Sequence, residues 1–294
     1  MGGVSSYPGR PGPIGRLQTS SGRNVNINGQ PYFCEKRLGS GGFGAVYQSR
    51  APNGTPVALK VTRLSGVGRA QMEGRVDAFL NEVGQLNRLR RETRHVVIIH
   101  DFAFDPRLGE AYIVMELGNE NLTTLIDRLR QMTGTGGGAI DGEMIHAFWQ
   151  QMVSIVGTLH KNRIVHMDLK PDNFILFGTT LKIADLGIAR KTSALGYGRL
   201  GTEGFSAPEV MRDIPGAPRY YTPKADIWSL GAILYYMVYG TVPGYHPAAA
   251  NPPHRQRPYP DHLLVSMLRR TLVFHPNQRA DIREVANHPF TRQQ

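Results

Sequence analysis

One segment, residues 164–173 (IVHMDLKPDN), constrains this chain more than any other. Within six residues it places the carboxylate of Asp168, the ammonium of Lys170 and the amide of Asn173, with apolar residues on both sides. A carboxylate can accept a proton from a hydroxyl group, an ammonium can neutralise a phosphoryl group, and carboxylate and amide oxygens suit Mg²⁺. The segment therefore predicts a loop that handles a hydroxyl and a phosphoryl group, provided that matching parts occur elsewhere in the chain.

A second candidate metal ligand follows twelve residues after Asn173. Asp185 ends the short apolar strand 181–184 and precedes Leu186 and Gly187. An aspartate at a strand end is often only a turn residue, but its place after the 164–173 loop favours a ligand of Mg²⁺, which prefers oxygen donors. The tripeptide Ala-Pro-Glu follows at residues 207–209.

Upstream, a glycine-rich segment precedes a lysine. Residues 38–46 (LGSGGFGAV) match G-x-G-x-x-G-x-V. A dinucleotide fingerprint would open a helix, whereas the residues after Gly44 continue as a strand. Glycines let backbone N–H groups approach phosphates without a Cβ clash. The next apolar strand ends in Lys60, which is a phosphate ligand or an ordinary solvated lysine, and the order of the motifs favours the first.

The lysine requires a carboxylate partner, and a predicted helix offers one. Apolar residues at positions 76, 79, 80, 83, 86 and 89 have helical spacing. Glu82 lies at the edge of this apolar face, one turn before Leu86, and is the expected partner of Lys60. Glu73 and Asp77 are the alternatives.

Taken in this order, the motifs resemble those of protein kinases. The resemblance covers residues 31–291 and implies an α+β, bilobal kinase fold. It implies a small antiparallel β lobe with one helix, called helix C, over residues 31–118, and a larger, mainly helical lobe over residues 119–291. It also implies that ATP binds between the two lobes.

The resemblance assigns roles to individual residues. Asp168, Lys170 and Lys60 are implied as catalytic, and Asn173 and Asp185 as ligands of Mg²⁺. Met115 would be the gatekeeper residue beside adenine, and Asn121 stands where many kinases have an acid for the ribose. The implied nucleotide-binding residues are Leu38, Gly39, Gly41, Gly44, Val46, Ala58, Lys60, Glu82, Met115, Glu116, Leu117 and Asn121.

Three further residues are implied as supports of the site. Thr202 would support the pair of Asp168 and Lys170. Asp226, near the start of a buried helix, can cap backbone N–H groups and would hold the 164–173 loop. Arg279 would pair with Glu209.

The implied reaction is transfer of the γ-phosphoryl group of Mg·ATP to serine or threonine in protein substrates. Lys170 favours this specificity, and dual specificity that includes tyrosine stays open. Residues 81–89, 115–119, 168–174 and 229–237 resemble the monopolar-spindle checkpoint kinases, which implies mitotic checkpoint signalling in the cytoplasm or nucleus, at the kinetochore. The alternative is a pseudokinase scaffold, which the departures Met167, Leu186 and Asn121 would support.

The amino-acid composition indicates which kinds of binding partner the chain suits. The net charge of +11 suits nucleic acid, anionic membranes or acidic proteins, but no nucleic-acid motif accompanies it, so we expect no specific nucleic-acid partner. The single cysteine, Cys34, excludes an internal disulfide and agrees with a reducing, intracellular compartment. No apolar run approaches the ~18–20 residues of a membrane span. We expect a monomer.

The first thirty residues differ in composition from the rest. Residues 1–30 are rich in Gly, Ser, Pro, Arg and Asn and contain no acid, which predicts a flexible tail. Residues 1–6 match M-G-x-x-x-[ST], a pattern for N-myristoylation that is short enough to occur by chance. We expect weak membrane association only if Gly2 carries this acyl chain.

Met167 stands where the kinase pattern has an arginine. That arginine often receives a phosphate from the activation loop, and methionine cannot. We therefore predict that activity does not depend on a phosphate–arginine pair at this position. A variant without the hydroxyl groups of Thr192, Ser193 and Tyr197 should keep its turnover in an assay of the purified protein, and abolished turnover would contradict the prediction.

Overall fold

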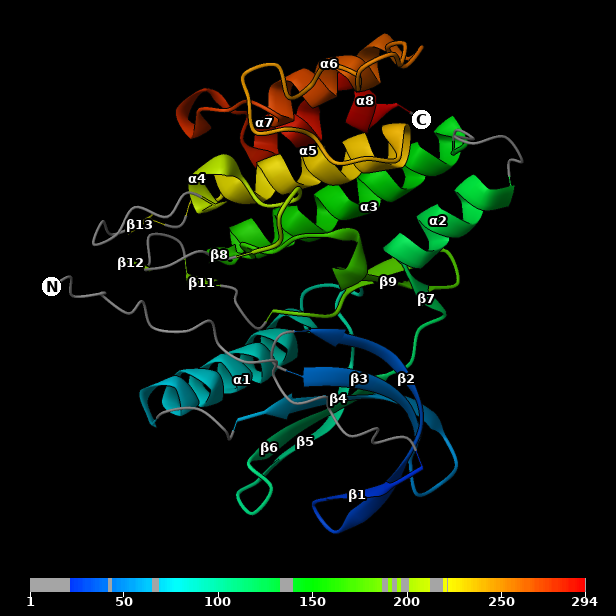
Figure 1. The fold of residues 1–294 in the computed structure, drawn as a ribbon, viewed down its shortest axis with the longest axis vertical. Coiled ribbons are helices and arrows are strands. Elements are labelled where there is room, and N and C mark those ends of the chain that lie inside the picture. The colour runs from blue at the N-terminus through cyan, green and yellow to red at the C-terminus, as the bar shows by residue number, and fades with distance from the viewer. Residues whose placement is uncertain are drawn as a thin grey trace, which may run out of the picture.

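The chain folds into two parts that differ in secondary structure. A smaller part consists of a twisted sheet and one long helix, and a larger part consists mainly of helices (Figure 1). The computed structural model describes residues 22–41, 44–64, 69–132, 140–186, 190–191, 195–196, 201–211, 219–220 and 222–293. The predicted α+β architecture, with a small antiparallel β lobe and a larger helical lobe, is confirmed.

The smaller part contains a six-stranded antiparallel sheet with the strand order β1-β2-β3-β4-β6-β5. Helix α1 (Arg69–Leu89) contacts β5. The strands of this sheet are β1 (Asn24–Ile27), β2 (Gln30–Gly41), β3 (Gly44–Arg50), β4 (Pro56–Arg63), β5 (Ile99–Asp105) and β6 (Glu110–Glu116).

Successive side chains of this sheet point to opposite faces, and the two faces belong to different cores. Leu59 and Val61 pack in a core within the smaller part, whereas Ala58 packs in the large core that extends into the helices. Lys60 is two residues from Ala58 on β4. The strand alternation therefore directs Lys60 toward the helical part.

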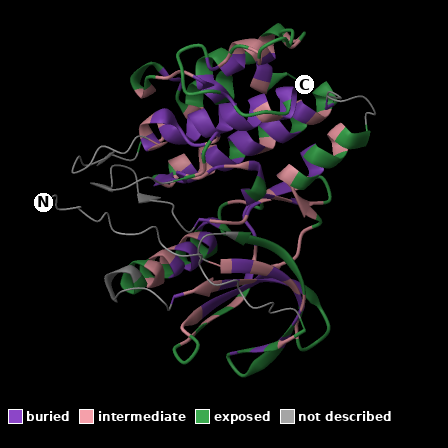
Figure 2. Cartoon of the chain, viewed as in Figure 1, coloured by how far each residue is buried: buried purple, intermediate pink, exposed green. Residues whose placement is uncertain are grey.

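The larger part is built around helix α5, which is buried along most of its length (Figure 2). Its helices are α2 (Leu122–Met132), α3 (Gly142–Lys161), α4 (Pro208–Met211), α5 (Lys224–Tyr239), α6 (His262–Thr271), α7 (Ile282–Asn287) and α8 (Pro289–Arg292), with 3₁₀ turns at Pro171–Asn173 and Pro276–Gln278. Its short strands are β7 (Glu120–Asn121), β8 (Ile164–Val165), β9 (Phe174–Phe177), β10 (Thr180–Ile183), β11 (Arg190–Lys191), β12 (Leu195–Gly196) and β13 (Arg219–Tyr220). Within the described ranges, no helix has the length and apolar character that a membrane span requires.

The predicted boundary at residue 31 needs correction. Residues 24–27 form β1, which pairs with β2, and the side chains of Val25 and Ile27 are 5% and 0% exposed. The Asn28 side chain then donates to Asp101 Oδ1 at 2.8 Å and to the Phe102 carbonyl oxygen at 3.1 Å, both on β5. The prediction of a flexible tail over residues 1–30 is therefore wrong for residues 24–28, because two alternate apolar side chains suffice to bury this short strand. Residues 1–21, including Gly2, lie outside the described part.

Candidate active site

The glycine-rich segment forms the end of the β2–β3 hairpin. Gly39 pairs with Val46, and Gly41 pairs with Gly44, while residues 42–43 are outside the described ranges. Gly44 lies so close to β4 that a Cβ atom there would overlap the carbonyl oxygen of Val61. Glycine at position 44 is therefore required by the approach of the two strands, independently of any ligand.

The residues expected around adenine share one face of the sheet. Ala58 on β4 lies opposite Met115 on β6, and both are buried, at 6% and 5% exposure. Val46 on β3 packs against the same core, and Leu38 is 48% exposed. This face is the one that also carries Lys60, so the structure brings Val46, Ala58 and Met115 to the same side of the sheet as Lys60.

Lys60 lies between two carboxylates. Its Nζ donates to both oxygens of Glu82, at 2.6 and 2.8 Å, and to Asp185 Oδ1 at 3.2 Å. Glu82 comes from α1 and is 3% exposed, whereas Glu73 and Asp77 are exposed on the same helix. Of the three candidate partners, the structure brings Glu82 to Lys60.

Burial and neighbouring charges shift the pKa values of Lys60 and Glu82 in opposite directions. Burial lowers the pKa of Lys60, but the attraction of Glu82 and Asp185 outweighs burial, so the pKa lies above its usual range and the ammonium stays charged. Burial raises the pKa of Glu82, and the Lys60 ammonium works against this shift. Because both Glu82 oxygens accept from one ammonium, we treat the two side chains as an ion pair.

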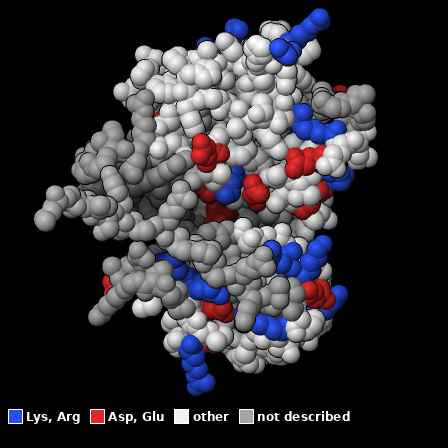
Figure 3. Space-filling view, viewed as in Figure 1, with Lys and Arg blue, Asp and Glu red and all other residues white. Residues whose placement is uncertain are grey.

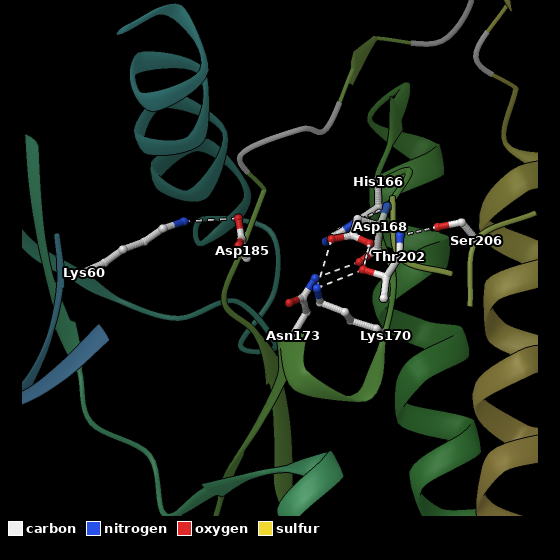
Figure 4. Close-up of polar contacts among 8 residues, drawn as sticks. All are labelled: Lys60, His166, Asp168, Lys170, Asn173, Asp185, Thr202 and Ser206. Carbon is white, nitrogen blue, oxygen red and sulfur yellow. Dashed lines mark hydrogen bonds and ion pairs between the residues drawn. The ribbon is translucent and has the colours of Figure 1, made fainter. Parts of the chain in front are cut away.

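The 164–173 loop brings a second polar group together. The Thr202 hydroxyl donates to Asp168 Oδ1 at 2.6 Å and accepts from Lys170 Nζ at 3.0 Å. Lys170 Nζ also lies 3.3 Å from Asp168 Oδ2. In Figure 4 these three side chains point toward one another, and Lys60 points toward Asp185 on the other side of the view. Thr202 therefore fixes the relative positions of the predicted base and the predicted lysine.

Asn173 and Asp185 fit a hard cation. Asn173 Nδ2 donates to the Asp168 carbonyl oxygen at 2.8 Å, which fixes the amide and leaves Oδ1 for another partner. The backbone joins the two residues, since Ala184 N donates to the Asn173 carbonyl oxygen at 3.1 Å. One amide oxygen and one carboxylate are the kind of ligands that Mg²⁺ accepts beside phosphate oxygens.

Asp226 holds the loop by its backbone. Its fully buried carboxylate accepts from the N–H groups of His166 and Met167, both at 2.9 Å, and lies 2.9 Å from His160 Nε2. A carboxylate only accepts, so His160 Nε2 carries the proton. Helix α5 begins without a side-chain cap, so the expectation that Asp226 caps this helix is wrong: the carboxylate turns to the loop instead.

Two other predicted residues have structural contacts. Arg279 is buried and donates to Glu209 Oε1 and Oε2 at 2.7 and 3.0 Å. Asn121 Oδ1 accepts from Thr124 N at 2.8 Å, at the start of α2. Arg279 thus pairs with Glu209, as the resemblance implied, and connects the Ala-Pro-Glu segment to the turn before α7.

Two supports of the loop escaped the sequence analysis. Gly201 has φ of +83°, and a Cβ atom there would overlap the Ser206 hydroxyl and lie 2.9 Å from the Met167 carbonyl oxygen. Ser206 Oγ in turn accepts from Thr202 N at 2.8 Å. The spacing Gly-Thr-x-x-x-Ser just before Ala-Pro-Glu is the signal that could have identified both residues.

Met167 has a strained backbone and a buried side chain. Its φ is +72°, in the left-handed region, and it is 3% exposed. Its side chain packs in the large core. Thr192, Ser193 and Tyr197 lie outside the described ranges, so the independence from an activation-loop phosphate stays a prediction.

Charged side chains gather where the two parts meet. Figure 3 shows acidic and basic groups together in the middle of this face, whereas the upper part of the face is mostly uncharged. Mixed charges at the junction suit a ligand that combines phosphates with a metal ion.

The comparison with known families agrees with this geometry. A model of the protein kinase domain matches residues 32–291. The chain belongs to the protein kinase family.

Three relatives show which protein kinases this chain resembles in sequence. The chain is 30% identical to the dual specificity protein kinase TTK of Mus musculus, over 95% of this chain and 34% of that protein. It is 32% identical to a probable serine/threonine-protein kinase mps1 of Dictyostelium discoideum, over 90% of this chain and 28% of that protein. It is 31% identical to the serine/threonine-protein kinase mph1 of Schizosaccharomyces pombe, over 71% of this chain and 31% of that protein. The chain thus spans about a third of the length of these relatives.

The contacts of Asp226 predict that replacing its carboxylate lowers the stability of the protein. In Asp226→Asn, an NH₂ group replaces one acceptor oxygen, so a buried N–H of the loop faces another donor. We expect a loss of about 2 kcal/mol in the free energy of unfolding, measured in urea. The control Asp127→Asn changes an exposed carboxylate whose Oδ1 accepts from the Tyr236 hydroxyl, and the amide keeps that acceptor. Equal stability of the two variants would contradict the assigned role of Asp226.

Proposed function

We propose that this chain transfers the γ-phosphoryl group of Mg·ATP to serine or threonine hydroxyl groups of protein substrates. The contact among Lys60, Glu82 and Asp185 carries the proposal. These residues come from β4, from α1 and from the segment after β10, and they meet in hydrogen bonds of 2.6 to 3.2 Å. A charged lysine held between two carboxylates is suited to bind phosphates beside a metal ion.

In this proposal the nucleotide lies under the sheet. The purine packs between Val46, Ala58 and Met115, and the backbone groups of Glu116 and Leu117 bind its edge. The backbone N–H groups of the β2–β3 hairpin, between Gly39 and Gly44, cover the phosphates. Lys60 binds the phosphates, and Leu38 and Asn121 lie at the outer rim, beside the purine and the ribose.

The reaction needs little covalent chemistry from the protein. Asp168 orients the substrate hydroxyl and accepts its proton. Lys170 offsets the negative charge that develops on the transferred group. Thr202 fixes the side chains of Asp168 and Lys170 relative to each other. Asn173 and Asp185 hold Mg²⁺, which neutralises phosphate charge when it is bound.

The proposal is tested by turnover of the purified chain with Mg·ATP and a mixed set of peptides that contain Ser, Thr or Tyr. We expect transfer to Ser and Thr in the wild-type protein. In Asp185→Asn, turnover should fall by at least about a hundredfold, because a charged metal ligand is lost. In Glu82→Gln it should fall by about tenfold, because Lys60 loses its charged partner.

The control Asp77→Asn removes a carboxylate from the exposed side of the same helix and should leave turnover within about twofold of the wild-type value. Turnover that is absent in the wild-type chain, or equal in Asp185→Asn, would contradict the enzyme proposal. A folded wild-type chain without turnover would be a pseudokinase scaffold. The same assay shows whether tyrosine is also an acceptor.

The relatives support a more specific role. We propose that this kinase acts in mitotic checkpoint signalling, because it is 30–32% identical to kinases named TTK and mps1 over most of its length. A fluorescently tagged full chain should then concentrate at kinetochores in dividing cells of its own source. An even distribution throughout mitosis would contradict this role.

A further inference from the structure

The segment that joins the two parts, residues 116–121, lies along one β-hairpin. This hairpin consists of β9 and β10, and β7 within the joining segment pairs with β9 (Figure 1). Asn119 N donates to the Leu176 carbonyl oxygen, and Asn119 Oδ1 accepts from Gly178 N, both at 2.7 Å. The joining segment is therefore fixed to the hairpin by backbone and side-chain hydrogen bonds.

Gly118 permits a close approach between the two. A Cβ atom at position 118 would overlap the side chain of Ile175 and lie 2.7 Å from the Leu176 carbonyl oxygen. The space on this side of the joining segment is already filled by β9. The segment therefore cannot move closer to the hairpin, and its contacts with the hairpin help to prevent it from moving away.

An ion pair supplies the strongest of these interactions. Lys182 Nζ, on β10, donates to both oxygens of Glu116, at 2.7 and 2.8 Å. The two side chains are 15% and 17% exposed. The Lys182 ammonium also lies 4.4 Å from the centre of the Phe177 ring, and Glu116 Oε1 accepts from Ile98 N at 2.8 Å. Such a largely buried, two-fold charge-assisted contact is stronger than a surface ion pair.

The open end of the same hairpin carries both proposed metal ligands. β9 begins directly after Asn173, and Asp185 follows two residues after β10 ends. The bond from Ala184 N to the Asn173 carbonyl oxygen, at 3.1 Å, closes this end. One rigid hairpin thus connects the ligands of the metal with Lys182, and through Lys182 with Glu116.

We propose that Lys182 is a positioning residue for the nucleotide. By holding the Glu116 carboxylate, it fixes the backbone that binds the purine edge onto the frame that carries Asn173 and Asp185. Without Lys182, the Glu116 carboxylate keeps only the Ile98 N–H and turns toward water, since a mostly buried charge without its counter-ion is costly. The backbone N–H of Glu116 keeps its bond to the Ile98 carbonyl oxygen at 3.0 Å. The side-chain link between residues 116–117 and the β9–β10 hairpin is lost. This inference rests on the proposed nucleotide site.

The test compares purine binding with catalysis in the full chain. In Lys182→Met, which keeps the contact with Phe177, we expect the Kd of adenosine to rise about tenfold in titration calorimetry. The KM for ATP should rise to a similar extent, while kcat stays within about threefold. Lys182→Arg keeps the charge and the paired hydrogen bonds, and should restore most of the affinity.

The matched control is Lys161→Met, because Lys161 is an exposed lysine that lies 4.0 Å from Glu92 Oε2. It should bind adenosine as the wild-type chain does. Glu116→Gln is the second variant: it keeps an acceptor for Ile98 N but loses the charge, so we expect about a threefold rise in the Kd of adenosine.

Two results would overturn the inference. One is an adenosine Kd within twofold of the wild-type value in both Lys182→Met and Glu116→Gln. The other is a wild-type chain that does not bind adenosine. A chain that binds adenosine in the expected rank order but does not turn over would support the inference and contradict the proposed enzyme activity, so the two failures are distinguishable.

Discussion

The buried carboxylate of Asp226 is the constraint on which the site depends. It lies at the start of the most buried helix and accepts the backbone N–H groups of two successive loop residues, His166 and Met167. A buried carboxylate is stable only when its oxygens are satisfied, so helix and loop determine each other's position. Asp168, the next residue, therefore has a fixed backbone before any substrate arrives.

In the proposed reaction, the chemistry is divided between two structural supports, a loop and a β-hairpin. The loop held by Asp226 carries Asp168 and Lys170, and the β9–β10 hairpin carries Asn173 and Asp185 at its open end. Lys60 joins the sheet to this arrangement through its contact with Asp185. Preorganised charges of this kind need no rearrangement at the moment of reaction, which is why they are effective in phosphoryl transfer.

The motifs and the resemblance predicted the main site residues and three of their supports, but not the contacts that lie outside any motif. The 3.6-residue period of α1 was sufficient to select Glu82 over Asp77, because helix geometry fixes which side chains share a face. The ion pair of Lys182 with Glu116 spans 66 residues and involves no motif, so nothing local indicated it. The short strand β1 was hidden for a similar reason: its two apolar residues acquire meaning only when β2 lies beside them.

The contact between Asn28 and β5 has a consequence for the edges of the main sheet. An edge strand presents unpaired backbone groups to which another chain can add, and β1 and β5 are the two edges of the main sheet. Because the Asn28 amide binds the Phe102 carbonyl oxygen, the turn after β1 covers one corner of the opposite edge. The sheet thus begins to close on itself, and one backbone acceptor of the β5 edge is already occupied within the chain.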